Sequence, residues 1–369
     1  MDISSPIKQL SIGRKKAGDL VGLDIEAGSV AAAEVHVNGS AQLKAAAIQP
    51  LPAGIFHDGE VADPEGLTES LKTLFSQHKL SKRVRLGIGN QRVIARTLRL
   101  PAIEDPKELD AAVRFQAQEQ IPMPLDQAML EHQVVGGVPA APDTPPQVDV
   151  VVIAARREMI ATFLDPIRRA GLEPVGVDLS AFGMIRSLAA VTDAGVAPVD
   201  GEPAAEEAVL FCSLGSVMNL AVARRRACLF TRVSGFGVEG IVGRVVAETD
   251  LIPEHATQWL AYVGLERATE EIDGGPEIVA IVRRALEEGL AGIVNELRLS
   301  LDYYGAQESA VPVGKVVLCG FGSAIPGLAA RVGEQIGLPI IVQRPGALAG
   351  YDDLSAARLT LPFGLALES

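Results

Sequence analysis

Hydrophobic and polar positions in the first fifty residues alternate in three short runs. Residues 20–25 and 29–37 are predicted as strands, and residues 40–48 form a third after an Asn38-Gly39 turn of the hairpin type. Three strands joined by short turns predict an antiparallel meander at the start of a domain. Residues 1–18, which precede it, are polar and contain Gly, Ser and Lys, as is typical of a flexible tail.

The rest of the first half mixes helical periodicity with further strands. Leu67, Leu71 and Leu74 repeat at the spacing of one helix face. Pro106 stands in the first turn of another predicted helix, and Gly171 follows the end of a third. By these criteria we predict helices over 64–79, 106–120 and 158–170, and strands over 84–88, 93–98, 130–135 and 148–154.

The second half repeats the opening pattern. Three strands are predicted over 208–214, 218–223 and 229–233, with Gly215-Ser216 in the first turn. Long stretches of helical periodicity follow, and a late strand runs directly into a glycine-bearing turn. Two halves that each begin with a three-strand meander predict a duplicated α/β architecture. The later elements are helices over 254–266 and 276–304 and a strand over 316–318.

Composition and charge narrow the function classes. Of 369 residues, 48% are hydrophobic and 21% charged, which is typical of a globular chain and excludes intrinsic disorder. The 46 acidic and 33 basic residues give a net charge of −13 at pH 7. A duplex binder neutralises phosphates with clustered Lys and Arg, so this balance argues against a nucleic-acid partner.

Cysteine and histidine usage argues against a metal site. Cys212, Cys228 and Cys319 lack CxxC spacing, and any pairing leaves one thiol over, which indicates a reducing compartment. The five histidines show no ligand spacing, so we predict neither metal-binding nor catalytic residues. No apolar run is long enough to span a membrane, and no secretory signal is present. We therefore expect a cytoplasmic chain that reaches a membrane only through a partner.

Three glycine-bearing turns follow predicted strands and are candidate phosphate loops. Such turns aim backbone N–H groups at an anion, although a single Gly-Ser turn is far more often only a turn. Their order along two similar halves makes the set more specific than any one member. The candidate cofactor-binding residues are Asp24, Gly28, Ser29, Gly215, Ser216, Asn219, Gly235, Gly237, Gly320, Gly322 and Ser323.

Short motifs across residues 20–369 carry a family resemblance. They are Val21-Gly22-Leu23-Asp24-Ile25, Arg99-Leu100-Pro101, and the segments 120–125, 152–158, 170–174, 177–181, 296–304 and 361–367. In their order and spacing, the chain resembles the PilM family of type IV pilus assembly proteins, which is related to FtsA and to GspL-type secretion proteins within the actin-like ATPase superfamily. In that superfamily two phosphate loops between strands precede a late glycine-rich adenosine loop.

The resemblance implies a fold and a division of the chain. The fold is α/β, of the actin-like ATPase (ribonuclease H-like) type, with two duplicated lobes around a nucleotide-type cleft and an inserted α/β subdomain. The expected parts are the first lobe at 19–85 and 169–200, the inserted PilM-type subdomain at 86–168, the second lobe at 201–235 and 311–354, its mostly helical subdomain at 236–310, and a C-terminal return to the first lobe at 355–369.

The resemblance also implies a partner. PilM-type proteins lie at the cytoplasmic side of the inner membrane, where they hold the N-terminal tail of the bitopic membrane protein PilN and meet other pilus components. The family places that tail in a groove between the first subdomain and the inserted one. Ile121, Pro122 and Met123 fall in the inserted region and are candidate partner contacts, because an adaptable apolar corner suits a peptide. The alternative is a helix stop with a packed Met.

Departures from the family pattern fall at nucleotide positions. The first loop usually has Gly where Glu26 stands and Lys where Ala31 stands, and the second usually has an acidic residue, at a position assigned here to Cys212. A magnesium–triphosphate site needs small residues and cations, and a carboxylate repels the phosphates. ATP and Mg²⁺ are the implied cofactors, and these changes predict weak or absent binding. The chain is therefore expected to be a scaffold and not an enzyme.

Two other functions compete with the scaffold. An active ATP-binding actin-like ATPase, FtsA-like or of a secretion system, needs the missing Lys and acidic residue, and an FtsA-like filament protein also needs a C-terminal amphipathic membrane helix. The sequence ends at residues 365–369 without one. A sugar kinase of the same superfamily needs an aspartate base in a long cleft loop, and none stands out.

Overall fold

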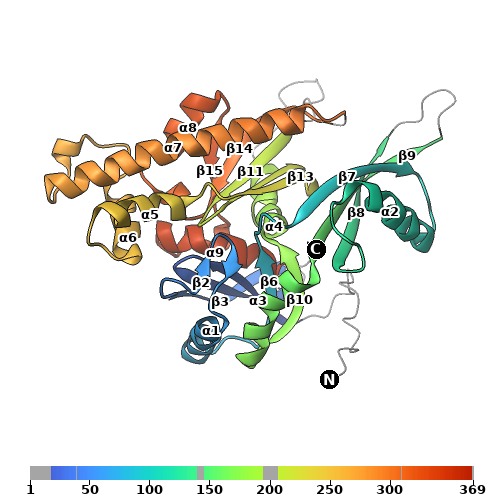
Figure 1. The fold of residues 1–369 in the computed structure, drawn as a ribbon, viewed down its shortest axis with the longest axis horizontal. Coiled ribbons are helices and arrows are strands. Elements are labelled where there is room, and N and C mark those ends of the chain that lie inside the picture. The colour runs from blue at the N-terminus through green and yellow to red at the C-terminus, as the bar shows by residue number, and fades with distance from the viewer. Residues whose placement is uncertain (1–17, 39, 139–144, 194–206, 309, 368–369) are drawn as a thin grey trace.

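The computed structural model describes residues 18–38, 40–138, 145–193, 207–308 and 310–367. The expected tail over 1–18 lies almost entirely outside this part of the chain. Figure 1 shows two lobes, one built mainly from the N-terminal half and one from the C-terminal half, with a smaller subdomain projecting from their side. This is the duplicated α/β architecture that the repeated strand pattern predicts.

The first lobe is a five-stranded mixed sheet covered on both faces. Its first three strands form the predicted antiparallel meander, and the other two pair in parallel next to β1. Helices α1 (Pro64–His78) and α3 (Arg157–Arg169) cover one face, and α4 (Ser180–Asp193) and α9 (Asp353–Ala366) pack against the other. The sheet order is β10 (Glu173–Leu179), β6 (Arg83–Ile88), β1 (Asp19–Glu26), β2 (Ser29–Asn38) and β3 (Ser40–Pro50).

The second lobe repeats this topology. A meander again leads the sheet, and two parallel strands again extend it on the side of the first strand. Its sheet order is β13 (Ala227–Ser234), β12 (Met218–Arg224), β11 (Ala208–Leu214), β14 (Val313–Cys319) and β15 (Ile340–Val342). Its helices are α5 (Val238–Glu248), α6 (Pro253–Val263), α7 (Pro276–Gly305), α8 (Leu328–Ile336) and the short turns η1 (Thr269–Glu271) and η2 (Phe321–Ala324). The turn η3 (Gly346–Leu348) leads back to the first lobe, where Leu348 packs against β2 and α9.

The inserted subdomain is narrower than residues 86–168. It contains a three-stranded antiparallel sheet in the order β7 (Ile94–Pro101), β9 (Gln147–Arg156) and β8 (Ala128–Val138), with α2 (Pro106–Gln120) packed on it. Strand β6 pairs with β1, and α3 packs in the core of the first lobe, so both belong to that lobe. Of the described residues, 94–138 and 145–156 thus form the subdomain itself.

A small hairpin at the edge of the first lobe is held firmly. It consists of β4 (Phe56–His57) and β5 (Glu60–Val61), joined by an Asp58-Gly59 turn in which both residues have positive φ, as a type I′ turn requires. The N–H groups of residues 62 and 63 donate to the Ile55 carbonyl, and the Asp63 carboxylate caps α1.

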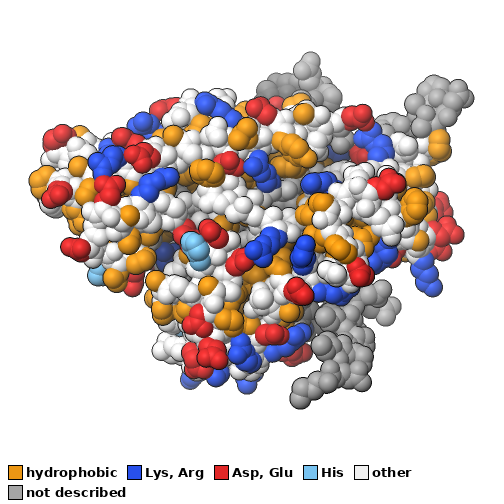
Figure 2. All heavy atoms as spheres, in the orientation of Figure 1, with side chains coloured by type: hydrophobic (Ala, Val, Ile, Leu, Met, Phe, Trp, Pro, Cys, Tyr) orange, Lys and Arg blue, Asp and Glu red, His pale blue; other side chains and the backbone are white. Residues whose placement is uncertain are grey.

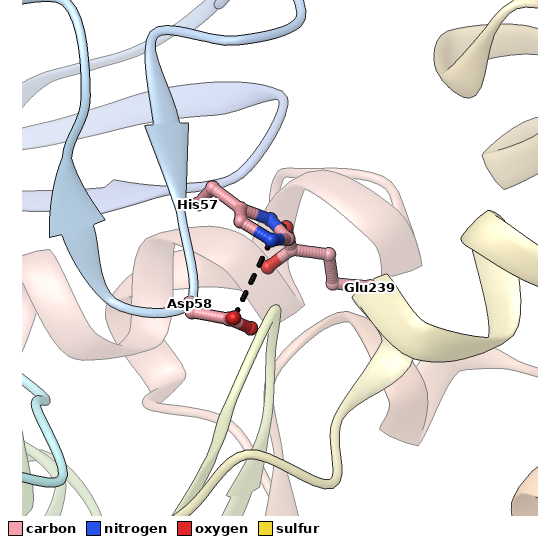
Figure 3. A group of neighbouring side chains, drawn as sticks. All are labelled: His57, Asp58 and Glu239. Carbon is pink, nitrogen blue, oxygen red and sulfur yellow. Dashed lines mark hydrogen bonds and ion pairs between the residues drawn. The ribbon is translucent and has the colours of Figure 1, made fainter.

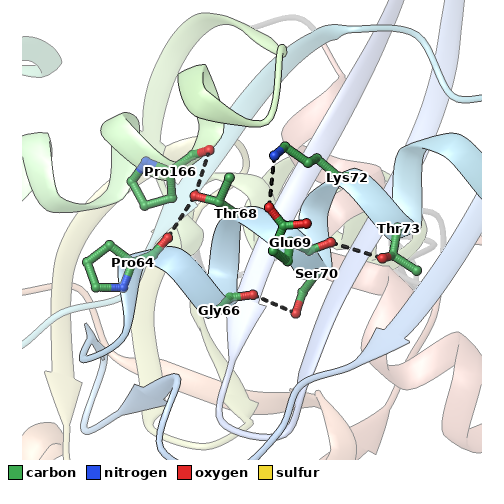
Figure 4. A network of polar contacts seen from close by, with 8 residues as sticks. All are labelled: Pro64, Gly66, Thr68, Glu69, Ser70, Lys72, Thr73 and Pro166. Atoms are coloured by element: carbon green, nitrogen blue, oxygen red, sulfur yellow. Dashed lines mark hydrogen bonds and ion pairs between the residues drawn. The ribbon is translucent and has the colours of Figure 1, made fainter.

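Figure 4 shows α1 joined to α3 through Thr68, whose hydroxyl lies 2.7 Å from the Pro64 carbonyl oxygen and 3.5 Å from that of Pro166.

The surface mixes charge types. On the face drawn in Figure 2, acidic and basic side chains are interspersed among hydrophobic ones and do not separate into large single-sign patches. Among the described residues, no helix is both long enough and apolar enough to cross a membrane.

Candidate functional site

The first strands of the two lobes end against one another. Glu26 ends β1 and Gly215 follows β11, and a Cβ placed on Gly215 would stand 1.6 Å from Glu26 Oε1. The carboxylate therefore lies on the bare backbone of the second glycine turn, in space that only glycine leaves open. The backbone N–H of Ser216 in the same turn stabilises the charged carboxylate. A side chain of this protein thus occupies an anion position at the candidate phosphate loop.

The second and third loops meet around the end of β11. A Cβ on Gly237 would stand 2.1 Å from the Ser216 carbonyl oxygen, and Val238 N–H donates to the Gly215 carbonyl at 2.8 Å. The third loop approaches as closely, because a Cβ on Gly320 or Gly322 would come within 2.9 or 2.6 Å of Leu214. Within that loop, the Ser323 hydroxyl donates to the Gly320 carbonyl at 2.7 Å. Six of the predicted residues are therefore brought together: Gly215, Ser216, Gly237, Gly320, Gly322 and Ser323.

Arg358 supplies a positive charge that the sequence analysis missed. It lies on α9, close enough to Glu26 to stabilise the ionised carboxylate, and its guanidinium stands 5.1 Å from the ring centroid of Phe321 in the third loop. Burial nonetheless raises the pKa of Glu26, and the Glu239 carboxylate adds to that rise while Arg358 and Ser216 oppose it. Arg358 connects the first and third loops.

Asp24 is buried inside the first lobe's side of the cleft. It is 7% exposed, and the Ser180 hydroxyl donates to its Oδ1 over a long 3.5 Å. Burial raises the pKa of Asp24 well above its usual range, and the nearby Glu26 carboxylate raises it further. Asp24 and Glu26 are therefore neighbouring carboxyl groups whose ionised forms repel one another.

The strand register corrects one expectation. The side chain of Cys212 packs in the core of the second lobe with Leu210 and Leu214, so it does not face the cleft. Its neighbour Ser213 points to the other face, where a Cβ on Gly320 would stand 2.7 Å from Ser213 Oγ. Because successive side chains of a strand alternate, assigning Cys212 to the carboxylate position is wrong by one residue, and Ser213 stands there.

The position of the absent lysine is closed. Ala31 pairs with Asp24 across the β1–β2 ladder and is only 4% exposed. It packs against α9, in a cluster that includes Ala356 and Leu359. A lysine at this position would have to displace α9, so the close packing of α9 requires a small residue such as Ala31.

The remaining predicted residues lie apart from the loop cluster. Gly28, with φ +85°, and the buried Ser29 form the β1–β2 turn, and nothing approaches Gly28 within 4 Å of its missing Cβ. Asn219 is buried on β12 and packs on Gly89, and its Oδ1 accepts no hydrogen bond from the described residues. Gly235 packs against Gln91. Asn219 and Gly235 thus contact the segment after β6.

A second contact crosses between the lobes near this cluster. His57, from the β4–β5 hairpin, bonds through Nδ1 to Glu239 in the first turn of α5, and its Nε2 lies 3.3 Å from Asp58 Oδ2 (Figure 3). The hydrogen bond to Glu239 is the main reason that the pKa of His57 is raised. Neither residue stands in a recognisable motif, so only tertiary structure brings them together.

The candidate partner residues differ in exposure. Ile121 is 4% exposed and packs in the subdomain core with Val113 and Leu130. Met123 is half-buried against the same core, and Pro122 is exposed. Of the three, Pro122 is the one whose side chain is fully available at the surface.

A cavity of about 470 Å³ lies between the inserted sheet and the second lobe. Thr97 on β7 donates to the Leu229 carbonyl at 3.4 Å beside it, and Arg99 pairs with Asp149 at 2.9 Å and with Glu308 at 3.6 Å. The cavity borders the second lobe, whereas the family resemblance implies a tail groove beside the first.

Comparison with known families decides the identity of the chain. Residues 22–361 match the profile of the type IV pilus assembly protein PilM. The chain belongs to the PilM family. The match runs from β1 to α9 and confirms the resemblance that the sequence motifs indicate.

Solved structures agree with this PilM assignment at the level of the fold. The chain is similar to a structure described as a PilM–PilN type IV pilus biogenesis complex, with a TM-score of 0.76 and 24% identity over 95% of this chain and 98% of the other. It is also similar to the ethanolamine utilization protein EutJ from Carboxydothermus hydrogenoformans, with a TM-score of 0.52 and 13% identity over 97% and 92%. The fold is actin-like, as expected.

The residues of this PilM-family cleft fit a magnesium–triphosphate poorly. A triphosphate needs N–H groups and cations, and the second loop already has a carboxylate against it. Ser213 and Ala31 stand where a metal-orienting acidic residue and a lysine would be needed. Arg358 is a cation in this part of the cleft, and it already lies near Glu26. We therefore derive no phosphoryl-transfer step from this arrangement.

Proposed function

We propose that this protein is a scaffold of type IV pilus assembly that holds the N-terminal cytoplasmic tail of a PilN-like inner-membrane protein, and that its nucleotide site is degenerate. Membership of the PilM family supports the pilus role. The similarity in fold to a PilM–PilN complex supports the choice of partner. In this account the chain is cytoplasmic, peripheral to the inner membrane through that partner, and in contact with further inner-membrane pilus components.

The contact between Glu26 and Gly215 carries the scaffold proposal. An actin-like enzyme needs its second loop free for phosphate, and here a carboxylate of the protein fills that position. The contact joins the two lobes without a nucleotide, because Glu26 belongs to the first lobe and Gly215 to the second. A cleft that is closed by its own side chains suits a stable binding platform better than a turnover cycle.

Two strand edges that no other described strand pairs with make the junction of the first lobe and the inserted subdomain suitable for a peptide. β10 is an edge strand of the first lobe's sheet, and β8 is an edge strand of the inserted sheet. An extended tail adds to such an edge through backbone hydrogen bonds, and its apolar side chains supply most of the affinity. Val175, at the bulge of β10, is 40% exposed, and Val134 on β8 is 45% exposed. We propose these valines and Pro122 as the contact surface, with Ile121 and Met123 supporting it from the subdomain core.

The charge of the chain favours a basic tail. The net charge of −13 attracts a peptide that carries Lys or Arg beside its apolar anchors and disfavours an acidic one. Exposed ion pairs contribute little to affinity. We therefore expect the charge to speed the association of the peptide, and the apolar contacts to keep it bound.

The decisive experiment measures binding of a tail peptide by isothermal titration calorimetry. The peptide is the cytoplasmic N-terminal segment of a PilN-like bitopic membrane protein from the same organism, and the protein is full-length and nucleotide-free. We expect 1:1 binding that falls at least ten-fold in Val175→Asp and in Val134→Asp. Val342→Asp is the matched control, because Val342 is 44% exposed on β15, the corresponding edge strand of the second lobe.

Circular dichroism melting of each variant keeps loss of folding apart from loss of binding. No binding of the peptide to folded wild-type protein would overturn the proposed partner. Full binding by both folded edge variants would overturn the proposed surface, and a loss in Val342→Asp alone would move the surface to the second lobe.

A further inference from the structure

We propose that His57, Asp58 and Glu239 bind a divalent transition-metal ion of the zinc class and that this ion fastens the first lobe to the second. The three residues offer one imidazole nitrogen and two carboxylate oxygens, which lie within 4.8 Å of one another. Figure 3 shows them converging from two elements, the β4–β5 turn and the first turn of α5. The proposal is independent of any nucleotide and of the tail-binding surface.

The ligand atoms lie close enough together to enclose an ion after a change of side-chain rotamer. The Nε2 atom of His57 is 3.3 Å from Asp58 Oδ2, and its Nδ1 bonds to Glu239 Oε1. A tetrahedral zinc ion with bonds of about 2.0–2.2 Å holds its ligand atoms about 3.4 Å apart. An ion binds only one of these two ring nitrogens, so the carboxylate at the other nitrogen must swing across to join it. His57 and Asp58 are 66% and 68% exposed, which leaves room for that rotation. Water would complete the coordination.

One carboxylate oxygen of Glu239 is buried without a hydrogen-bond partner among the described residues. The Oε2 atom of Glu239 is inaccessible to solvent and accepts no hydrogen bond from the described residues, although its side chain is 20% exposed overall. An unpaired carboxylate oxygen at such a depth is costly unless a cation or donor reaches it. A metal ion between Glu239 and His57 would supply that charge.

The surroundings add negative charge and rigidity. Glu26 lies close enough to Glu239 to raise its own pKa, so the carboxylates of Asp58, Glu239 and Glu26 gather at one mouth of the cleft. The Asp58-Gly59 turn fixes the hairpin, and the Val238 N–H bond to Gly215 fixes the start of α5. Rigid elements on both sides are what a metal site between lobes requires.

The chemistry of the ligands selects the ion. One imidazole and two carboxylates suit Zn²⁺, Ni²⁺ or Mn²⁺, and by the usual order of affinities Zn²⁺ binds more tightly than Mn²⁺. Mg²⁺ prefers oxygen ligands alone and loses water reluctantly, so it competes poorly here. Without metal, the same residues form direct contacts between the imidazole and the two carboxylates, and the test must separate these two states.

The test is calorimetric titration of the full chain with ZnCl₂ after treatment with EDTA, repeated with MgCl₂. We expect one zinc site, at least ten-fold selectivity over magnesium, and a melting temperature that rises with zinc. His57→Ala and Glu239→Gln should each weaken zinc binding at least ten-fold. His255→Ala and Glu254→Gln are matched controls from the exposed start of α6, and they should bind zinc like the wild type.

Two results would overturn the site. One is the absence of a 1:1 zinc isotherm in folded wild-type protein. The other is unchanged zinc affinity in folded His57→Ala or Glu239→Gln, which would assign the ion to other residues and leave a plain ion pair between the lobes. Melting of each metal-free variant verifies that it is folded before titration.

Discussion

Glu26 of the first lobe lies directly on Gly215 of the second, with its Oε1 1.6 Å from the point where a Cβ on Gly215 would stand. Arg358 supports the same carboxylate from α9 and covers the ring of Phe321 in the third loop. Three segments that an actin-like enzyme turns toward its nucleotide thus contact one another through side chains of the protein itself. Substitutions at this contact can therefore test the structure of the cleft without any ligand.

Gly215→Ala should destabilise the protein. The new methyl group cannot share space with Glu26, so the carboxylate must leave the second loop. Because the obstacle is the end of a flexible side chain, we expect a modest cost of about 0.5–1 kcal/mol in the free energy of unfolding. Urea denaturation measures this cost. Gly346→Ala is the control, because nothing lies within 4 Å of a Cβ there. In a protein that already carries Glu26→Ala, Gly215→Ala should cost less free energy of unfolding than in the wild type. If the effects of the two substitutions simply add in the double variant, the two residues do not interact.

Nucleotide affinity should be recoverable by two changes. Glu26→Gly removes the carboxylate from the second loop, and Ser213→Asp places an acidic residue on the cleft side of β11. We expect the double variant to bind MgATP at least ten-fold more tightly than the wild type by calorimetry. Cys212→Asp should instead lower the melting temperature, because that side chain packs in the core and an unpaired charge there is costly. If Cys212→Asp raised the affinity for MgATP as much as Ser213→Asp does, the β11 register described above would be wrong.

Asp24→Asn should stabilise the protein at neutral pH. Burial raises the pKa of Asp24 in the folded state, so its favourable contribution is complete below the ordinary value of 3.8 and is lost as pH rises through the raised value. Removing the charge should increase the free energy of unfolding at pH 7 by about 1 kcal/mol. The advantage should shrink toward pH 4, and an advantage independent of pH would contradict the assignment to charge.

The contact between His57 and Glu239 should weaken in metal-free protein as pH rises through the raised pKa of His57. The pKa of His57 is raised by its hydrogen bond to Glu239, so the stabilisation is complete below 6.5 and is lost as pH rises through the raised value. Exposure of His57 keeps the effect below about 1 kcal/mol. Urea denaturation of wild type and His57→Ala at pH 6 and pH 8.5 measures it, and the difference between the two proteins should be larger at pH 6. A larger difference at pH 8.5 would contradict the ion pair.

Local patterns were sufficient for most of the fold. The short apolar runs in residues 20–48 and 208–233 predict both meanders, and the leading strands of both lobes are buried at almost every residue because their sheets are covered on both faces. The periodicity of Leu67, Leu71 and Leu74 predicts α1, whose buried face contains all three. The glycine turns at 215 and 320 were found because close backbone approach demands glycine.

Contacts between distant segments were beyond local patterns. Arg358 comes near Glu26, and His57 contacts Glu239, only because the two lobes and α9 fold together. The choice between Cys212 and Ser213 depends on strand register, in which a slip of one residue moves a side chain to the opposite face. The exposure of Ile121 depends on how α2 packs on the inserted sheet.

The most direct measurement of the central claim is calorimetric titration of the full, chelator-treated chain with MgATP, with hydrolysis followed in the same samples. Because Glu26 already occupies the second loop, we predict weak or absent binding and turnover far below about 1 per second, the low end of ordinary enzyme rates. Tight binding with turnover of about 1 per second or faster would show that Glu26 leaves the loop readily, and would contradict the scaffold account.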